Sequence, residues 1–95
     1  MIRRCEMILT GHVQGVGLRA ATQRRAHAAG LTGWVMNKKD GSVFVVVEGE
    51  LPSIVQLSRW FEQGFGKGLS IFVQKKWGEP KEEFQDFSIR FEEEM

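Results

Sequence analysis

The chain has little of what several functional classes require. Among its 95 residues there is one cysteine, Cys5, and the formal net charge is only +1. A single cysteine excludes an intramolecular disulfide and a multi-cysteine metal site. The small net charge gives no general reason to expect binding to nucleic acid or to an anionic membrane. No apolar run is long enough for a signal peptide or a membrane span, so we expect a cytoplasmic protein.

The length and composition that remain are those of one small globular domain. Hydrophobic residues make up 42% of the chain and charged residues 26%, and no repeat, linker or low-complexity tract interrupts it. About 95 residues suffice for one core of modest stability. We therefore expect a single domain over residues 1–95.

The hydrophobic periodicity predicts a sequence of short strands and two helices. The predicted strands are Arg4–Thr10, Leu31–Asn37, Ser42–Glu48, Ser70–Trp77 and Phe84–Phe91, and the helices are Arg19–Ala29, ended by Gly30, and one that opens at Leu51–Pro52–Ser53. Gly64, Gly66 and Gly68 predict a flexible loop after the second helix. This order predicts an α+β, ferredoxin-like βαββαβ sandwich, an antiparallel sheet with both helices on one face.

The spacing of apolar residues along each predicted helix and strand indicates which side of it faces the core. We expect inward-facing side chains at Cys5, at Leu18, Thr22, Ala26 and Ala29, at Ile54, Leu57 and Phe61, and at Phe87, Ile89 and Phe91. On this interpretation Cys5 is a core residue and not a nucleophile. Neither histidine has a second ligand at metal-binding spacing, and both His12 and His27 are expected to face solvent.

The segment Gly11–Arg19 has the features of an anion-binding loop. Three glycines within seven residues free the backbone to turn its N–H groups in one direction, and Arg19 follows where a helix begins. Backbone donors and a helix N-terminus form a concave anion site, and a guanidinium can bind two oxygens of one phosphate. The expected donors are the backbone N–H groups of Gly15, Val16, Gly17 and Leu18. The glycines fit neither a Walker loop nor a dinucleotide fingerprint.

Two long motifs give the chain a resemblance to a known family. The first is Gly-His-Val-Gln-Gly-Val-Gly-Leu-Arg at residues 11–19, and the second is Gly-Trp-Val-Met-Asn-Lys-Lys-Asp-Gly-Ser-Val at residues 33–43. Together they resemble the two signature regions of the acylphosphatases. The clear departure is Leu18, where that family usually carries phenylalanine.

The resemblance implies an activity and assigns roles. It implies hydrolysis of acyl phosphates to carboxylate and inorganic phosphate, with Arg19 and the loop N–H groups holding the phosphate and Asn37 positioning the attacking water. An asparagine amide can hold water but is no strong base. The implied mechanism needs no metal and no cofactor, and inorganic phosphate or sulfate should compete with the substrate. Asp40 and Gly41 are interpreted as turn residues, and Glu92–Glu94 as a solvated tail.

An alternative function rests on the sheet face that carries no helix. Phe44 and Val46 project to that face, where Trp34 and Ile8 can join them. RNA-recognition domains stack bases on aromatics of such a face, although the RNP1-type pattern is absent here. The alternative is a non-catalytic module for RNA or a protein partner, or an accessory domain that handles a carbamoyl-type phosphate for a partner. We expect a monomer that binds no nucleic acid and no membrane, with a homodimer through this face as the other possibility.

Overall fold

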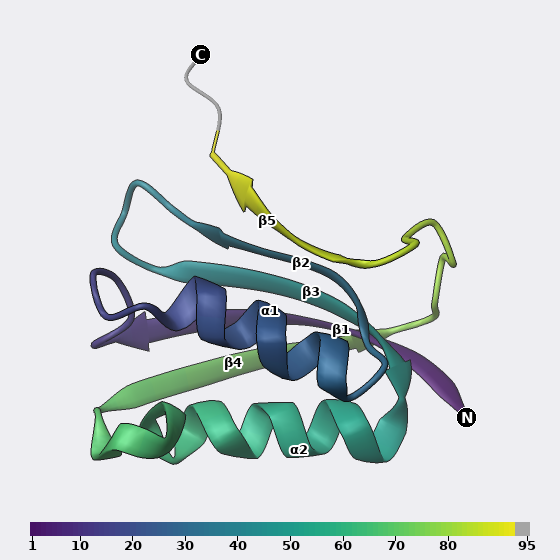
Figure 1. Ribbon diagram of the computed structural model, residues 1–95, viewed down its shortest axis with the longest axis horizontal. Coiled ribbons are helices and arrows are strands. Elements are labelled where there is room, and N and C mark those ends of the chain that lie inside the picture. Colours follow the sequence, from purple (N-terminus) through teal and green to yellow (C-terminus); the bar gives the residue numbers. More distant parts are fainter. Residues whose placement is uncertain (93–95) are drawn as a thin grey trace.

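Five strands and two helices form a two-layer sandwich in the computed structural model, which describes residues 1–92. The strands are β1 (Ile2–Gly11), β2 (Thr32–Asn37), β3 (Val43–Glu50), β4 (Ile71–Gly78) and β5 (Phe87–Phe91). The helices are α1 (Leu18–Ala28) and α2 (Leu51–Glu62). Figure 1 shows both helices against one face of the sheet. The ferredoxin-like fold predicted from the sequence is therefore confirmed.

The sheet has the order β4-β1-β3-β2-β5, and one of its pairs departs from the antiparallel expectation. The strand β5 runs parallel to β2, with Phe91 beside Asn37, so the sheet is mixed. A parallel neighbour needs a long crossover, which the chain provides between β2 and β5. This register places the end of β5 next to the last residue of β2.

The core lies between the sheet and the helices. Alternate residues of β1 face Val43, Val45 and Val47 of β3, and the opposite pairs are all fully buried. Helix α2 contributes Ile54, Leu57 and Phe61 to this core, as predicted. Its early Pro52 fits a first helical turn, where a missing backbone N–H costs little.

Three expectations about packing are corrected by the structure. Ala29 is exposed, because α1 ends one residue before it, whereas Leu18, Thr22 and Ala26 are buried as predicted. The segment Gly64–Gly68 has an irregular backbone, with left-handed conformations at Phe65 and Gly66, and its Phe65 is buried in the core. The last strand begins at Phe87 and not at Phe84, and its Phe91 is 73% exposed.

Candidate active site

The loop between β1 and α1 turns on two glycines in left-handed backbone conformations. Gly15 has φ 76° and Gly17 has φ 78°, backbone angles that residues other than glycine rarely adopt. Gly17 directly precedes α1, and no side chain caps the helix. Within residues 1–92 the backbone N–H groups of Gly15, Val16, Gly17 and Leu18 donate no hydrogen bond. The loop therefore offers a row of unused donors at a helix N-terminus, as an anion site requires.

Three of these four residues border a surface hollow of about 250 Å³. Five of the six residues singled out by the sequence line it; its lining is Val13, Gly15, Gly17, Leu18, Arg19, Ala20, Asn37, Ile89 and Phe91. The sixth, Val16, is not in the lining, and its side chain packs against the core. Residues far apart in the sequence thus meet in one small space.

Arg19 is the second residue of α1 and lies at the hollow with its charge uncompensated. Its side chain is half-buried, and among the described residues no carboxylate forms an ion pair with it. The guanidinium carbon lies 5.4 Å from the centre of the Phe91 ring. A cation at a helix N-terminus is electrostatically unfavourable, so a bound anion would relieve a penalty that the free protein carries.

Asn37 ends β2, lines the same hollow and has an unused hydrogen-bond acceptor. Its Oδ1 atom is buried and accepts no hydrogen bond within the described chain. A buried polar atom without a partner costs free energy, and such atoms in native proteins usually have a water or ligand to bind. The amide group of Asn37 is therefore suited to hold a small polar molecule in the hollow.

Gln14 joins the loop to the hairpin that follows Asn37, a role that the sequence alone did not reveal. Its Nε2 donates to the carbonyl oxygen of Lys38 at 2.7 Å and to that of Ser42 at 2.9 Å. Figure 1 shows the β1–α1 loop and the β2–β3 hairpin side by side at one end of the molecule. Gln14 thereby joins the loop that carries the backbone donors to the hairpin that begins next to Asn37.

The hairpin itself is held by Asp40, in agreement with its predicted turn role. Asp40 Oδ1 accepts from the Ser42 hydroxyl at 2.6 Å and from the Ser42 backbone N–H at 2.9 Å. These hydrogen bonds lower the pKa of the Asp40 carboxyl, so the group stays ionised. A carboxylate committed to the turn in this way is not free to act as a base.

Glu92 is not a solvated tail residue, and the interpretation of residues 92–94 was wrong at this position. Its carboxylate lies 2.8 Å from Lys38 Nζ and accepts from the Lys39 backbone N–H at 2.6 Å. The hydrogen bond and charge of Lys38 lower the pKa of Glu92, and Glu92 raises the pKa of Lys38 in return. Glu93 and Glu94 lie outside the described residues.

The remaining candidate groups have structural surroundings. Burial raises the pKa of the Cys5 thiol to about 11, so this fully buried thiol is no nucleophile, as expected. His12 is exposed, whereas His27 has its Nε2 atom 3.0 Å from the carbonyl oxygen of Phe87, a contact that was not predicted. No cluster of three His, Cys, Asp or Glu side chains that could hold a metal ion occurs within residues 1–92. No helix in that range is long and apolar enough to cross a membrane.

Comparison with known proteins places the chain in a family. The acylphosphatase family model matches residues 5–89. An acylphosphatase of Caldanaerobacter subterraneus is 39% identical over 89 residues, which cover 94% of this chain and 99% of that protein. Acylphosphatase from Bacillus subtilis has a TM-score of 0.83 at 27% identity, covering 95% of this chain and 99% of that chain. Full-length HypF in a phosphate- and nucleotide-bound form gives 0.81 at 30% identity, covering 95% of this chain but 12% of that one.

Proposed function

Because the chain belongs to the acylphosphatase family and is an enzyme that hydrolyses acyl phosphates, we propose that the reaction takes place in the hollow between the β1–α1 loop and Asn37. One observation carries this proposal. Three residues with unused backbone donors (Gly15, Gly17 and Leu18), Arg19 with no carboxylate partner among residues 1–92, and Asn37 all line the same 250 Å³ hollow.

The substrate phosphate lies between the loop and Arg19. The N–H groups of Gly15, Val16, Gly17 and Leu18 donate to its oxygens, and the guanidinium binds two of them side by side. Charge on the equatorial oxygens is what an enzyme must stabilise in phosphoryl transfer. Fixed donors at a helix N-terminus supply that stabilisation without having to reorganise during the reaction.

Water held by Asn37 attacks the phosphorus atom in line with the leaving carboxylate. The new bond joins the water oxygen to phosphorus, the bond between phosphorus and the acyl oxygen breaks, and the acyl group leaves as carboxylate. The proton of the attacking water passes to an oxygen of the product phosphate. A carboxylate is a good leaving group, so this route uses no general acid, and the chain places none in the hollow lining.

The apolar part of the lining receives the acyl group. Ile89 and Phe91 of β5 supply apolar surface to the lining of the hollow. Such surface can cover a carbon chain or ring but offers no polar group to recognise one. The recognised part of the substrate is thus its phosphate.

The test is hydrolysis of an aryl acyl phosphate, measured beside an aryl phosphate monoester and with and without a chelator. We expect release of carboxylate and phosphate from the acyl phosphate in the presence of chelator, and little action on the monoester, whose aryloxide leaving group is more basic than a carboxylate. Loss of activity with chelator and its return with Mg²⁺ would overturn the mechanism. Equal rates on both substrates would overturn the role of the leaving group.

The alternative of a non-catalytic binding module is set aside because the chain is an enzyme. Its aromatic residues on the open face are also engaged with one another. Trp34 meets Phe44 edge to face at 5.2 Å, and the Arg90 guanidinium lies 5.0 Å from the centre of the Trp34 ring. Side chains occupied in this way are poor platforms for stacking bases.

A further inference from the structure

The last residue of β5 has an exposure that packing in the core does not explain. Phe91 is 73% exposed, which is unfavourable for a phenylalanine, yet its ring faces the Arg19 guanidinium and lines the hollow. It pairs in register with Asn37 on the neighbouring strand. Phe91 is therefore a neighbour of both Arg19, which we propose binds the phosphate, and Asn37, which we propose holds the water.

Arg19 needs such a neighbour to have a defined orientation. A guanidinium binds two phosphate oxygens only when its plane points at them, and the arginine side chain has many rotatable bonds. Within residues 1–92 no carboxylate holds it. An aromatic ring on one face of the guanidinium restricts its plane while leaving the N–H edge free for an anion.

The strand end that carries Phe91 is itself fixed by its neighbour. The Glu92 carboxylate contacts Lys38 Nζ and the Lys39 backbone N–H, both in the hairpin that directly follows Asn37. Phe91 is thus held on the strand side by pairing with β2 and at its end by two contacts. Gln14 of the β1–α1 loop also donates a hydrogen bond to this hairpin.

We propose that Phe91 is a positioning residue for Arg19, with Glu92 anchoring the strand end so that the ring stays against the guanidinium. This inference rests on the proposed function. It adds that the orientation of Arg19, and not its charge alone, is set by the last strand.

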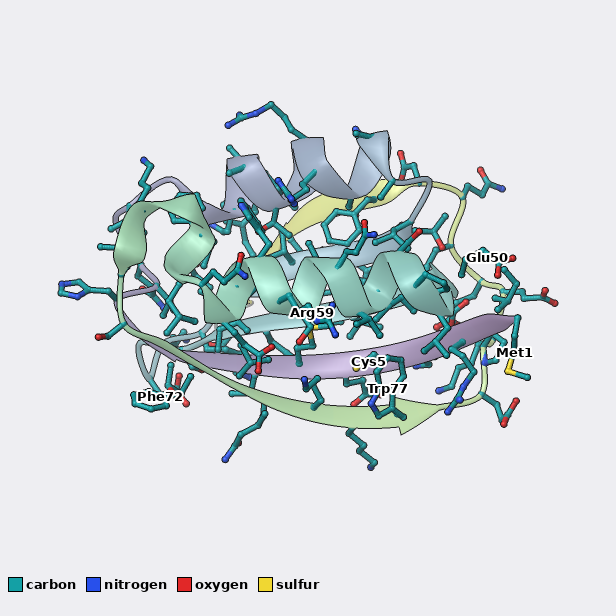
Figure 2. All side chains as sticks on the ribbon, turned by 90° about the horizontal axis from the view of Figure 1, so that it is seen from below. Met1, Cys5, Glu50, Arg59, Phe72 and Trp77 are labelled. Atoms are coloured by element: carbon teal, nitrogen blue, oxygen red, sulfur yellow. The ribbon has the colours of Figure 1, made fainter. Side chains whose placement is uncertain are left out.

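The first test replaces Phe91 by leucine and by tyrosine and measures kcat, KM and the inhibition constant of inorganic phosphate. Leucine removes the ring face, and we expect kcat/KM to fall and the phosphate inhibition constant to rise, each by about five-fold, the size of a partly exposed cation–π contact. Tyrosine keeps the ring face and should retain wild-type values. The matched control is Phe72→Leu, since Phe72 is 71% exposed on β4, at the other edge of the sheet (Figure 2).

The second test combines Phe91→Leu with Arg19→Ala. If the ring acts through Arg19, the double variant is no weaker than Arg19→Ala alone. An equal loss in the leucine and tyrosine variants, a loss as large in Phe72→Leu, or additive effects in the double variant would overturn the inference. If Arg19→Ala itself kept wild-type activity, the proposed function would fail instead, so the two failures are distinct.

Glu92→Ala tests the anchor. We expect it to lower kcat/KM in the same direction as Phe91→Leu by a smaller factor, about two- to three-fold, and to add nothing to Phe91→Leu. The control is Glu50→Gln. Glu50 is also an exposed carboxylate in an ion pair, at 2.7 Å from the N-terminal ammonium of Met1, but it does not line the hollow. In Figure 2 it lies at the opposite end of the molecule from Phe72. Wild-type kinetics in Glu92→Ala would remove Glu92 from the proposal.

Discussion

Arg19 and Asn37 both have hydrogen-bonding capacity that the folded chain leaves unused. Among residues 1–92 Arg19 has no carboxylate partner, and the buried Oδ1 of Asn37 accepts no hydrogen bond. Most buried polar groups in native proteins are paired, so an unpaired one calls for an explanation. Arg3 Nε and Thr22 Oγ1 are also buried without a partner in this range, but of these residues only Arg19 and Asn37 line the hollow.

Replacing Arg19 by lysine separates geometry from charge. Lysine keeps the positive charge but cannot bind two phosphate oxygens in a planar arrangement, so we expect kcat/KM to fall by at least about ten-fold. Arg19→Ala should lose more, in both kcat and phosphate affinity. Steady-state kinetics with an aryl acyl phosphate and phosphate inhibition measure both effects. Near wild-type values for the lysine variant would mean that charge alone matters.

Replacing Asn37 by alanine should affect the rate and not the affinity. If Asn37 holds water and not phosphate, kcat falls on the order of a hundred-fold while the phosphate inhibition constant hardly changes. Asn37→Asp should not restore the rate, because its carboxylate adds negative charge beside the phosphate. Since Asn37 also ends β2, each variant needs a circular dichroism spectrum. A folded alanine variant with normal turnover would take Asn37 out of the mechanism.

Residues whose role depends on distant partners were the ones that the sequence did not reveal. Arg19, Asn37 and the loop glycines stand in motifs, so their types and spacing sufficed to identify them. Gln14 bonds to residues 24 and 28 positions away, and Glu92 to a residue 53 positions away. Such contacts depend on how strands pair, which local patterns do not specify. An exposed Phe91 at a predicted inward position was missed for the same reason.

At the scale of elements, strand and helix types were predicted well and their ends less well. Helix α1 and the hairpin β2–β3 follow from alanine-rich and alternating segments with a turn at Asp40–Gly41. Residues 84–86, directly before β5, were mispredicted as strand. Just before them, Glu82 has a left-handed φ of 54°, and the Glu48 carboxylate accepts from the backbone N–H groups of Lys81 and Glu82. A long-range carboxylate, not local propensity, shapes this connection.

The contact between the β1–α1 loop and the β2–β3 hairpin can be tested with Gln14→Leu. Leucine keeps the size of the side chain but loses both hydrogen bonds to carbonyl oxygens, each worth about 1 kcal/mol. The loop should then be less well placed, and we expect phosphate to bind about five-fold more weakly. Isothermal titration with inorganic phosphate measures this, with the exposed Gln74→Leu as control. Unchanged phosphate affinity would mean that the loop keeps its shape without Gln14.

At the scale of the whole molecule, we expect stability and catalysis to depend on separate groups. Arg4 and Glu48 form a buried ion pair at 3.0 Å on the sheet face away from the helices. Burial acts to raise the pKa of Glu48, but the N–H groups of Lys81 and Glu82 and the charge of Arg4 outweigh it, so the pKa lies below its usual value. None of these residues lines the hollow. The single domain and the monomeric state stay predictions.

Glu48→Gln should therefore lower stability and leave kinetics intact. The variant removes the shortest ion pair of Arg4, which keeps longer contacts to Glu6 at 3.5 Å and to Glu83 at 3.8 Å, and we expect a loss of about 2 kcal/mol in the free energy of unfolding in urea. Because the folded pKa of Glu48 is depressed, its contribution is present above pH 4.5 and is lost as the pH falls through the folded value. The variant should consequently lose less stability than wild type on acidification. An unchanged unfolding midpoint, or a large fall in kcat/KM, would contradict this separation.

The most direct test of the account is a titration of the wild-type protein with inorganic phosphate, followed by the chemical shifts of the backbone amides. The account predicts that the amide signals of Gly15, Val16, Gly17 and Leu18 move together with one dissociation constant. It also predicts that Arg19→Ala weakens this binding strongly while Asn37→Ala leaves it nearly unchanged. Saturable shifts confined to another surface, with the four loop amides unmoved, would contradict the proposed phosphate site.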